Sequence, residues 1–111
     1  MTVTDVTTEA QITTGAVLAA NVSASAVSIV NDAQRQLRSL NNAAWFDADG
    51  NYIPFVAATV VGNTLCVTDD YKAALTAFYI SKTYRSEQEN PGHQALADKY
   101  MAEFLTLART L

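Results

Sequence analysis

Apolar residues recur at helical spacing along the C-terminal part of the chain, with polar residues between them. Over 91–111 they follow one another at steps of three or four residues: Leu96, Tyr100, Phe104, Leu107 and Leu111. This spacing places all of them on one face of an α-helix. The pattern therefore predicts an amphipathic helix over 91–111.

A second helical pattern covers 68–90. It begins at Thr68-Asp69-Asp70, where a hydroxyl can cap the helix and two acids lie near the positive end of its dipole. Asn90-Pro91-Gly92 separates this helix from the last one. We expect the two helices to form an antiparallel hairpin, with a seam made of Leu75, Phe78, Tyr100, Phe104 and Leu107.

Two aromatic residues of this hairpin are neighbours in the sequence, Phe78 and Tyr79. Consecutive residues lie about 100° apart around an α-helix, so both side chains cannot point into the same seam. We therefore expect Tyr79 to face either the second main helix or another subunit.

The region 23–44 carries another helical pattern, and either Ser23 or Ser25 is a competent N-cap. The predicted buried stripe consists of Val27, Val30, Ala33, Leu37, Leu40 and Ala44. Polar residues are expected to flank or oppose this stripe, namely Asn31, Asp32, Gln34, Arg35, Gln36 and Arg38.

Residues 1–22 begin with a stretch rich in Thr and Val, and β-branched residues lower helix propensity. Val6, Ala10 and Ile12 nevertheless fall on one side of a helix, which favours a short helix over 2–12. The alternative is an arm that becomes ordered only on a neighbouring subunit. The Thr/Val segment is also a candidate for assembly contacts, and we expect that deleting 1–12 leaves a folded protein that cannot assemble.

Between the second and third main helices, the region 45–67 predicts a loop and a β-hairpin. The runs Ala58–Val61 and Thr64–Val67 flank Gly62-Asn63, which is a hairpin signal. Asp47–Asn51 superficially suggests a calcium loop, but no glutamate closes a ligand loop of the required length. We interpret that stretch as a turn.

The predicted fold class is mainly α. One domain, 1–111, is expected to form a small bundle of three to four helices with a short β-hairpin between the second and third main helices. Its predicted segments are an N-terminal arm or short helix (1–22), a helix (23–44), a loop with the hairpin (45–67) and two further helices (68–90 and 91–111). Because an isolated hairpin is marginally stable, it must lean on the helices or on a neighbouring subunit.

Charged residues make up only 16% of the chain, against about 25% in an ordinary soluble domain, which favours burial of surface against partners. The formal net charge of −4 argues against a basic surface that binds nucleic acid. We find no apolar run long enough to span a membrane and no basic N-terminal region of a signal peptide. We therefore expect a cytosolic protein that does not bind membranes.

Residues of reactive type are too few to predict a catalytic or metal site. Cys66 and His93 each occur once, so no cluster of His and Cys ligands exists, and no nucleophile has a predictable base beside it. The glycines are scattered and form no phosphate-binding loop. We expect no catalytic residues, no cofactor and no metal, and hence no enzyme.

The run Val27–Leu37 reads VSIVNDAQRQL, and the later helix carries Asp70-Tyr71, Ala74-Leu75, Phe78 and Tyr84 in order. The first run resembles the LNDAQRE-L helix of the head–tail adaptor (connector) proteins of tailed bacteriophages. The second set is similar to their D-Y-x-x-A-L-x-x-Y-x-x-x-x-x-Y helix, with Phe78 at one Tyr position. Acids, a small-residue break and a final amphipathic helix follow in the same order, so the resemblance covers nearly the whole chain.

This resemblance implies a structural virion protein, located in the neck between capsid and tail and in the host cytoplasm during assembly. It implies a homo-oligomeric ring of about a dozen copies, docked beneath the portal protein and receiving the tail or a tail-completion protein. DNA would pass through the ring without sequence-specific binding, which suits an acidic chain.

Candidate contacts with other subunits or with the portal come from residues outside the predicted helix seam: Val3, Val6, Trp45, Phe46, Tyr52, Phe55, Tyr79 and Leu111. Many relatives carry a longer β-rich insert where this chain has only Trp45–Val67, so contacts made by that insert do not transfer. The alternative function is a small helical regulatory or protein-binding module, such as an antitoxin-like partner, or a tail-completion protein. A basic DNA-reading helix would favour a regulator, and the sequence shows none.

Overall fold

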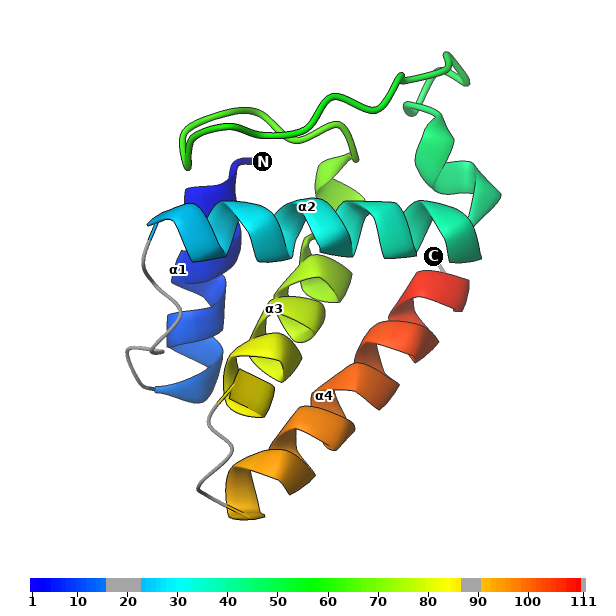
Figure 1. Ribbon diagram of the computed structural model, residues 1–111. Coiled ribbons are helices and arrows are strands. Elements are labelled where there is room, and N and C mark those ends of the chain that lie inside the picture. Colours follow the sequence, from blue (N-terminus) through cyan, green and yellow to red (C-terminus); the bar gives the residue numbers. More distant parts are fainter. Residues whose placement is uncertain (16–22, 87–90, 111) are drawn as a thin grey trace.

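The computed structural model describes residues 1–15, 23–86 and 91–110 of the chain, and the regular elements of these residues are helices (Figure 1). Four α-helices follow in order: α1 (Val3–Thr14), α2 (Ser23–Leu40), α3 (Lys72–Ser86) and α4 (Pro91–Thr110). Two short 3-10 helices, η1 (Asn42–Trp45) and η2 (Asp69–Tyr71), lie between α2 and α3. The mainly α prediction is confirmed.

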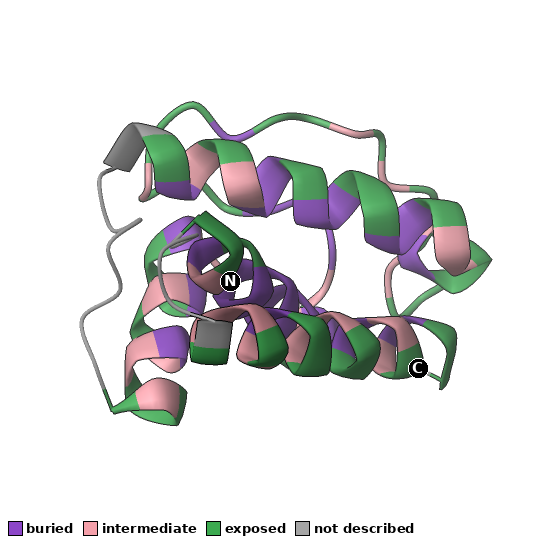
Figure 2. Ribbon diagram, turned by 60° about the horizontal axis from the view of Figure 1, so that its bottom comes forward, coloured by how far each residue is buried: buried purple, intermediate pink, exposed green. Residues whose placement is uncertain are grey.

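The helices α1, α3 and α4 lie on one side of α2, which crosses them (Figures 1 and 2). The central element is α3, which packs against all three other helices and is buried over most of its length. The helices α3 and α4 run antiparallel and make the most extensive contact in the molecule.

The first helix is held by caps at both of its ends. Thr2 and Asp5 form a capping box: the Asp5 N–H donates to the Thr2 hydroxyl (3.2 Å), and the Thr2 N–H donates to the Asp5 carboxylate (2.9 Å). Gly15 ends the helix in the left-handed conformation that glycine adopts without strain. These caps offset the weak intrinsic helix propensity of the Thr- and Val-rich stretch.

The helix α1 is part of the core of the monomer. Val3, Val6 and Ala10 are completely buried at spacings of three and four residues. The first twelve residues are therefore not an arm, and deleting them would remove a wall of the hydrophobic core. We correct the expectation that such a deletion leaves a folded protein. The remainder of the predicted segment 1–22, residues 16–22, lies outside the described residues.

The helix α2 buries the predicted apolar stripe, with Val30, Ala33 and Leu37 completely inaccessible and Val27 and Leu40 packed on its edge. The polar residues expected to flank or oppose this stripe are not all exposed. Asn31, Gln34 and Arg38 are also buried, and their side chains have the specific partners described below.

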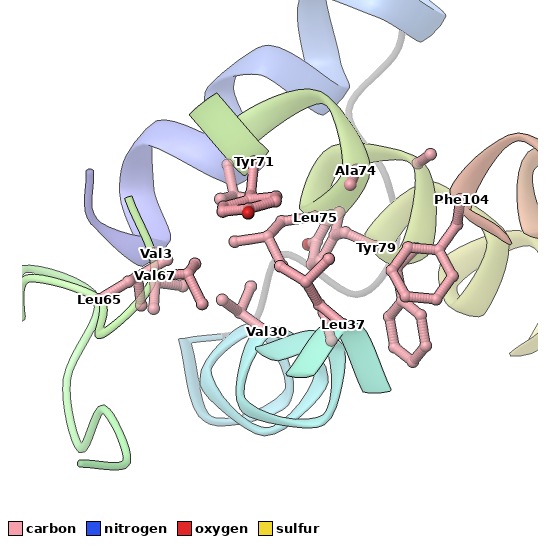
Figure 3. Packing of buried hydrophobic residues seen from close by; sticks show 14 of the residues in the cluster. Val3, Val30, Leu37, Leu65, Val67, Tyr71, Ala74, Leu75, Tyr79 and Phe104 are labelled. Atoms are coloured by element: carbon pink, nitrogen blue, oxygen red, sulfur yellow. The ribbon is translucent and has the colours of Figure 1, made fainter. Parts of the chain in front are cut away.

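The predicted antiparallel packing of α3 and α4 is present, and Phe78 and Phe104 of the predicted seam meet in it, whereas Leu75 points toward α2. The rings of Phe78 and Phe104 meet edge to face with centroids 5.0 Å apart, and Tyr84 stacks near Tyr100 at 6.3 Å. Tyr79 is completely buried in the core cluster that also contains Leu37 and Leu75 (Figure 3). Burial raises the pKa of the Tyr79 phenol above its ordinary value. Tyr79 therefore contributes to the monomer core.

The predicted β-hairpin is wrong. The described residues contain no β-strand, only isolated bridges between Thr2 and Thr64 and between Phe46 and Tyr52. A turn does form, with the Asn63 N–H donating to the Val60 carbonyl (3.2 Å). The flanking runs do not pair with each other because their backbone groups bond to α1 and α2.

Replacing Phe104 by Ala would leave a cavity against the edge of the Phe78 ring. We expect Phe104→Ala to lower the free energy of unfolding by about 3–5 kcal/mol, the usual cost for a buried Phe. Thermal melts measure this loss, with the exposed Thr106→Ala of the same helix as the control. Equal melting temperatures for the two variants would contradict the packing.

The capping box makes the stability of α1 depend on pH. The Thr2 N–H bond to the Asp5 carboxylate lowers the pKa of Asp5 in the folded state. The contribution is therefore complete above the unfolded pKa of about 3.9 and is lost as the pH falls through the lower folded value. We expect urea titrations to show wild type exceeding Asp5→Asn in stability at pH 6, with the difference shrinking toward pH 2. A difference that does not change with pH would contradict this role.

Candidate interaction surface

Residues 46–67 form a strap that runs beside α2, turns near the N-terminal end of α2 and returns toward η2 (Figure 1). The strap has almost no internal secondary structure, yet several of its residues are buried: Ala58, Leu65, Cys66 and Val67. A buried loop needs partners for its backbone N–H and C=O groups. The strap takes these partners mainly from α2.

The first attachment is made by Asn31. Its amide N–H donates to the Ala58 carbonyl, and its amide oxygen accepts from the Ala58 N–H, both at 2.9 Å. One side chain thus satisfies both backbone groups of one strap residue. This arrangement is the one that a neighbouring β-strand would provide, and it explains why Ala58 has no strand partner.

The second attachment joins Cys66 to Gln34 and Arg38. The Cys66 N–H and thiol both donate to the Gln34 side-chain oxygen, at 2.9 and 3.0 Å. The Arg38 guanidinium donates to the Cys66 carbonyl at 2.9 Å. We call Asn31, Gln34 and Arg38 the clamp, because together they satisfy the backbone groups of two buried strap residues.

Arg38 also organises the aromatic start of the strap. Its guanidinium lies 4.5 Å from the centre of the Trp45 ring, and the Trp45 indole N–H donates to the Arg38 carbonyl at 3.0 Å. Tyr52 stacks with Trp45, with ring centroids 6.0 Å apart and nearly parallel planes. Two further guanidinium nitrogens of Arg38, Nε and Nη1, are buried without a partner among the described residues.

Side chains also close the two turns of the strap. The Asp47 carboxylate accepts from the N–H groups of Asp49 and Asn51, both at 2.9 Å, and the Asn51 bond lowers the pKa of Asp47. At the other turn, the Asn63 side-chain oxygen accepts from the N–H groups of Thr59 (2.9 Å) and Val60 (3.2 Å). The acid-rich stretch is a turn, as expected.

The strap is tied to α1 as well. The Thr4 N–H donates to the Val61 carbonyl at 3.0 Å, and the Leu65 N–H donates to the Met1 carbonyl at 2.9 Å. The bonds to α1 and α2 therefore hold the returning half of the strap on both sides.

The strap carries exposed apolar residues among its exposed polar ones. Of the five exposed large hydrophobic residues in the described ranges, four lie on it, and we call these four the outer row: Phe46 (43% exposed), Tyr52 (60%), Val56 (66%) and Val60 (56%). A cluster of exposed apolar residues on a small protein marks a contact surface. The outer row is therefore the candidate interaction surface.

The structure divides the predicted contact residues into two groups. Phe46 and Tyr52 belong to the outer row, while Trp45 and Phe55 are half-buried beneath it, with the Arg35 guanidinium 4.8 Å from the Phe55 ring. The others are not on the surface: Val3, Val6 and Tyr79 are completely buried in the core. Leu111 lies outside the described residues.

Sequence reasoning missed the other half of the outer row and all of the clamp. The predicted hairpin places Val60 in a strand, and neither the hairpin nor the predicted contact residues include Val56. Asn31, Gln34 and Arg38 share one helix face, because they lie three and four residues apart beside the apolar stripe. That spacing of polar residues was a signal for burial.

Within the described ranges, no three His, Cys, Asp or Glu side chains come together as a metal site would require. None of the described helices is long and apolar enough to cross a membrane. Comparisons with protein-family models, curated proteins and solved structures found no match.

Removing the Gln34 side chain would leave the buried Cys66 N–H without an acceptor. We expect Gln34→Ala to lower the free energy of unfolding by about 1–3 kcal/mol, the cost of an unsatisfied buried donor. The matched control is Gln36→Ala, because Gln36 is exposed on the same helix and its loss should cost less than about 0.5 kcal/mol. Denaturant titrations that place both variants at the same stability would refute the clamp.

Proposed function

We propose that this protein is a structural head–tail adaptor of a tailed phage, forming a ring beneath the portal. The observation that carries the proposal is the role of the run Val27–Leu37, which holds Asn31 and Gln34 and is followed directly by Arg38. The run that resembles the adaptor family is the run that clamps the strap. This gives the resemblance a physical reason, since the run positions the candidate interaction surface.

The surface of the molecule supports a role in assembly. Its exposed apolar side chains lie mostly on a segment fixed by hydrogen bonds to two helices. A loop fixed before binding loses less conformational entropy on association than a flexible one. A subunit that must join many identical copies benefits from such a preorganised surface.

The charge of the chain supports the passage of DNA. A net charge of −4 and exposed acids such as Asp49 and Asp70 provide no basic track for phosphates. An acidic ring would repel the DNA backbone and let the genome move through the channel. In this proposal, the portal lies on one side of the ring and the tail or a tail-completion protein on the other.

Removing the gene from the phage that carries it tests the proposal. We expect DNA-filled heads without tails, because heads packaged with DNA would lack the ring to which tails attach. Electron microscopy of lysates measures this. Expression of the wild-type chain should restore tailed particles, and so should Gln36→Ala as a control. Normal numbers of tailed particles without the gene would rule out the adaptor role.

A further inference from the structure

A second surface feature lies on the side of α3 that faces away from α2. Ala73 and Ala77 each lie two positions from Leu75, about 200° around the helix, and Leu75 points into the core toward α2 (Figure 3). A groove of about 100 Å³ opens there between α1 and α4. Its lining includes Glu9, Thr13, Ala73, Thr76, Ala77 and Glu103. We call this the α3 groove.

The α3 groove contains an unsatisfied polar group. Thr76 is only 4% exposed, and its hydroxyl has no hydrogen-bond partner among the described residues. Such groups are rare because each costs free energy when buried. An incoming chain that offers a backbone N–H or C=O would satisfy it.

The strap carries the matching feature. Its extended segment 54–57 makes no backbone hydrogen bond within the part of the chain that the structure describes. Val56 is in the middle of this segment and is 66% exposed, the highest value in the outer row. The groove is smaller than the cavity of about 150 Å³ that accommodates benzene in another protein. A Val side chain therefore suits it better than the ring of Tyr52 does.

The charges and the remaining apolar surface agree with this pairing. Arg35 lies beside Phe55 on the strap side and forms an exposed ion pair with Asp32 at 3.2 Å, while Glu103 at the groove has no ion pair among the described residues. An exposed pair of this kind is worth little, so Arg35 can also face Glu103 of a second copy. The fifth exposed large hydrophobic residue, Ile12, lies one helical turn from Glu9 of the groove lining. Among the described residues, the exposed large hydrophobic side chains therefore lie on the strap, apart from Ile12, which lies near the groove.

We propose that Val56 and its extended segment on one copy dock into the α3 groove of a second copy. The two features do not overlap, so each copy can offer its strap to one neighbour and its groove to another. Contacts between two different patches are head-to-tail and close into a ring when the rotation permits. The inference thus deepens the proposed function by identifying the contact between ring subunits.

Two variants remove one partner feature each. Val56→Asp places a charge where the apolar side chain would enter the groove, and Ala73→Arg fills the groove from an exposed position of α3. Their controls are Ala48→Asp in the strap turn and Ala102→Arg on α4, which are exposed and outside both features. Circular dichroism confirms that all four variants fold.

Analytical ultracentrifugation of the full chain measures the association. The protein concentration is raised to about 1 mM, at which complexes with a dissociation constant of about 1 mM are well populated. We expect wild type and both controls to form a concentration-dependent series beyond the dimer. Val56→Asp and Ala73→Arg should each remain monomeric. Their equimolar mixture should form a one-to-one dimer, because each variant keeps the feature that the other lacks.

Three results would overturn the docking: a monomeric wild type, a wild-type series that stops at the dimer, or a mixture that does not associate. Failure of the docking and failure of the adaptor role are distinguishable. A monomeric wild type together with tailless particles on gene removal would overturn the docking alone. The opposite combination would overturn the adaptor role alone: the wild type associates through Val56 and the α3 groove, but phage without the gene still form normal tailed particles.

Discussion

The structure depends on hydrogen bonds between the clamp of α2 and the backbone of the strap. Ala58 and Cys66 are buried, and no strand pairing satisfies their N–H and C=O groups. Asn31, Gln34 and Arg38 supply these bonds instead. Without the clamp, Leu65 and Val67 could enter the core only by burying unpaired polar groups. The same helix therefore builds the core with its apolar stripe and positions the strap with its polar side.

Helices were predictable from this sequence because their stabilising pattern is local. The stripe of Val30, Ala33 and Leu37, and the seam of Phe78 and Phe104, follow the 3.6-residue period. The local pattern could not exclude the β-hairpin, because β-branched runs on both sides of Gly62-Asn63 fit a hairpin as well as they fit the observed strap. What decided against it was a set of side-chain bonds spanning 27 to 32 residues along the chain.

The candidate surface was predictable only in part, for the same reason. Trp45, Phe46, Tyr52 and Phe55 were correctly placed outside the helix seam because they lie between helices. Val3 and Val6 were misplaced, since their burial depends on a capping box that converts a poor helix sequence into a stable first turn. Whether a Val faces the core or solvent is decided by tertiary contacts, and a β-branched run alone does not reveal them.

The proposed function follows from how rigidly the apolar surface is held. An adaptor subunit must meet its neighbours in one orientation, and a strap with backbone groups bonded to two helices can present the outer row in that way. The chain thus uses polar residues inside the molecule to expose apolar residues outside it. Assembly through the strap would bury those apolar residues against a partner and so remove them from water.

Amide hydrogen exchange along the strap of the wild-type monomer, followed residue by residue by NMR, tests the clamp most directly. The structure predicts slow exchange at Ala58 and Cys66, because their N–H groups are buried and bonded to Asn31 and Gln34. It predicts fast exchange at Val56 and Ala57, which are exposed and unbonded. Equally fast exchange at all four amides would contradict the clamp and the account built on it.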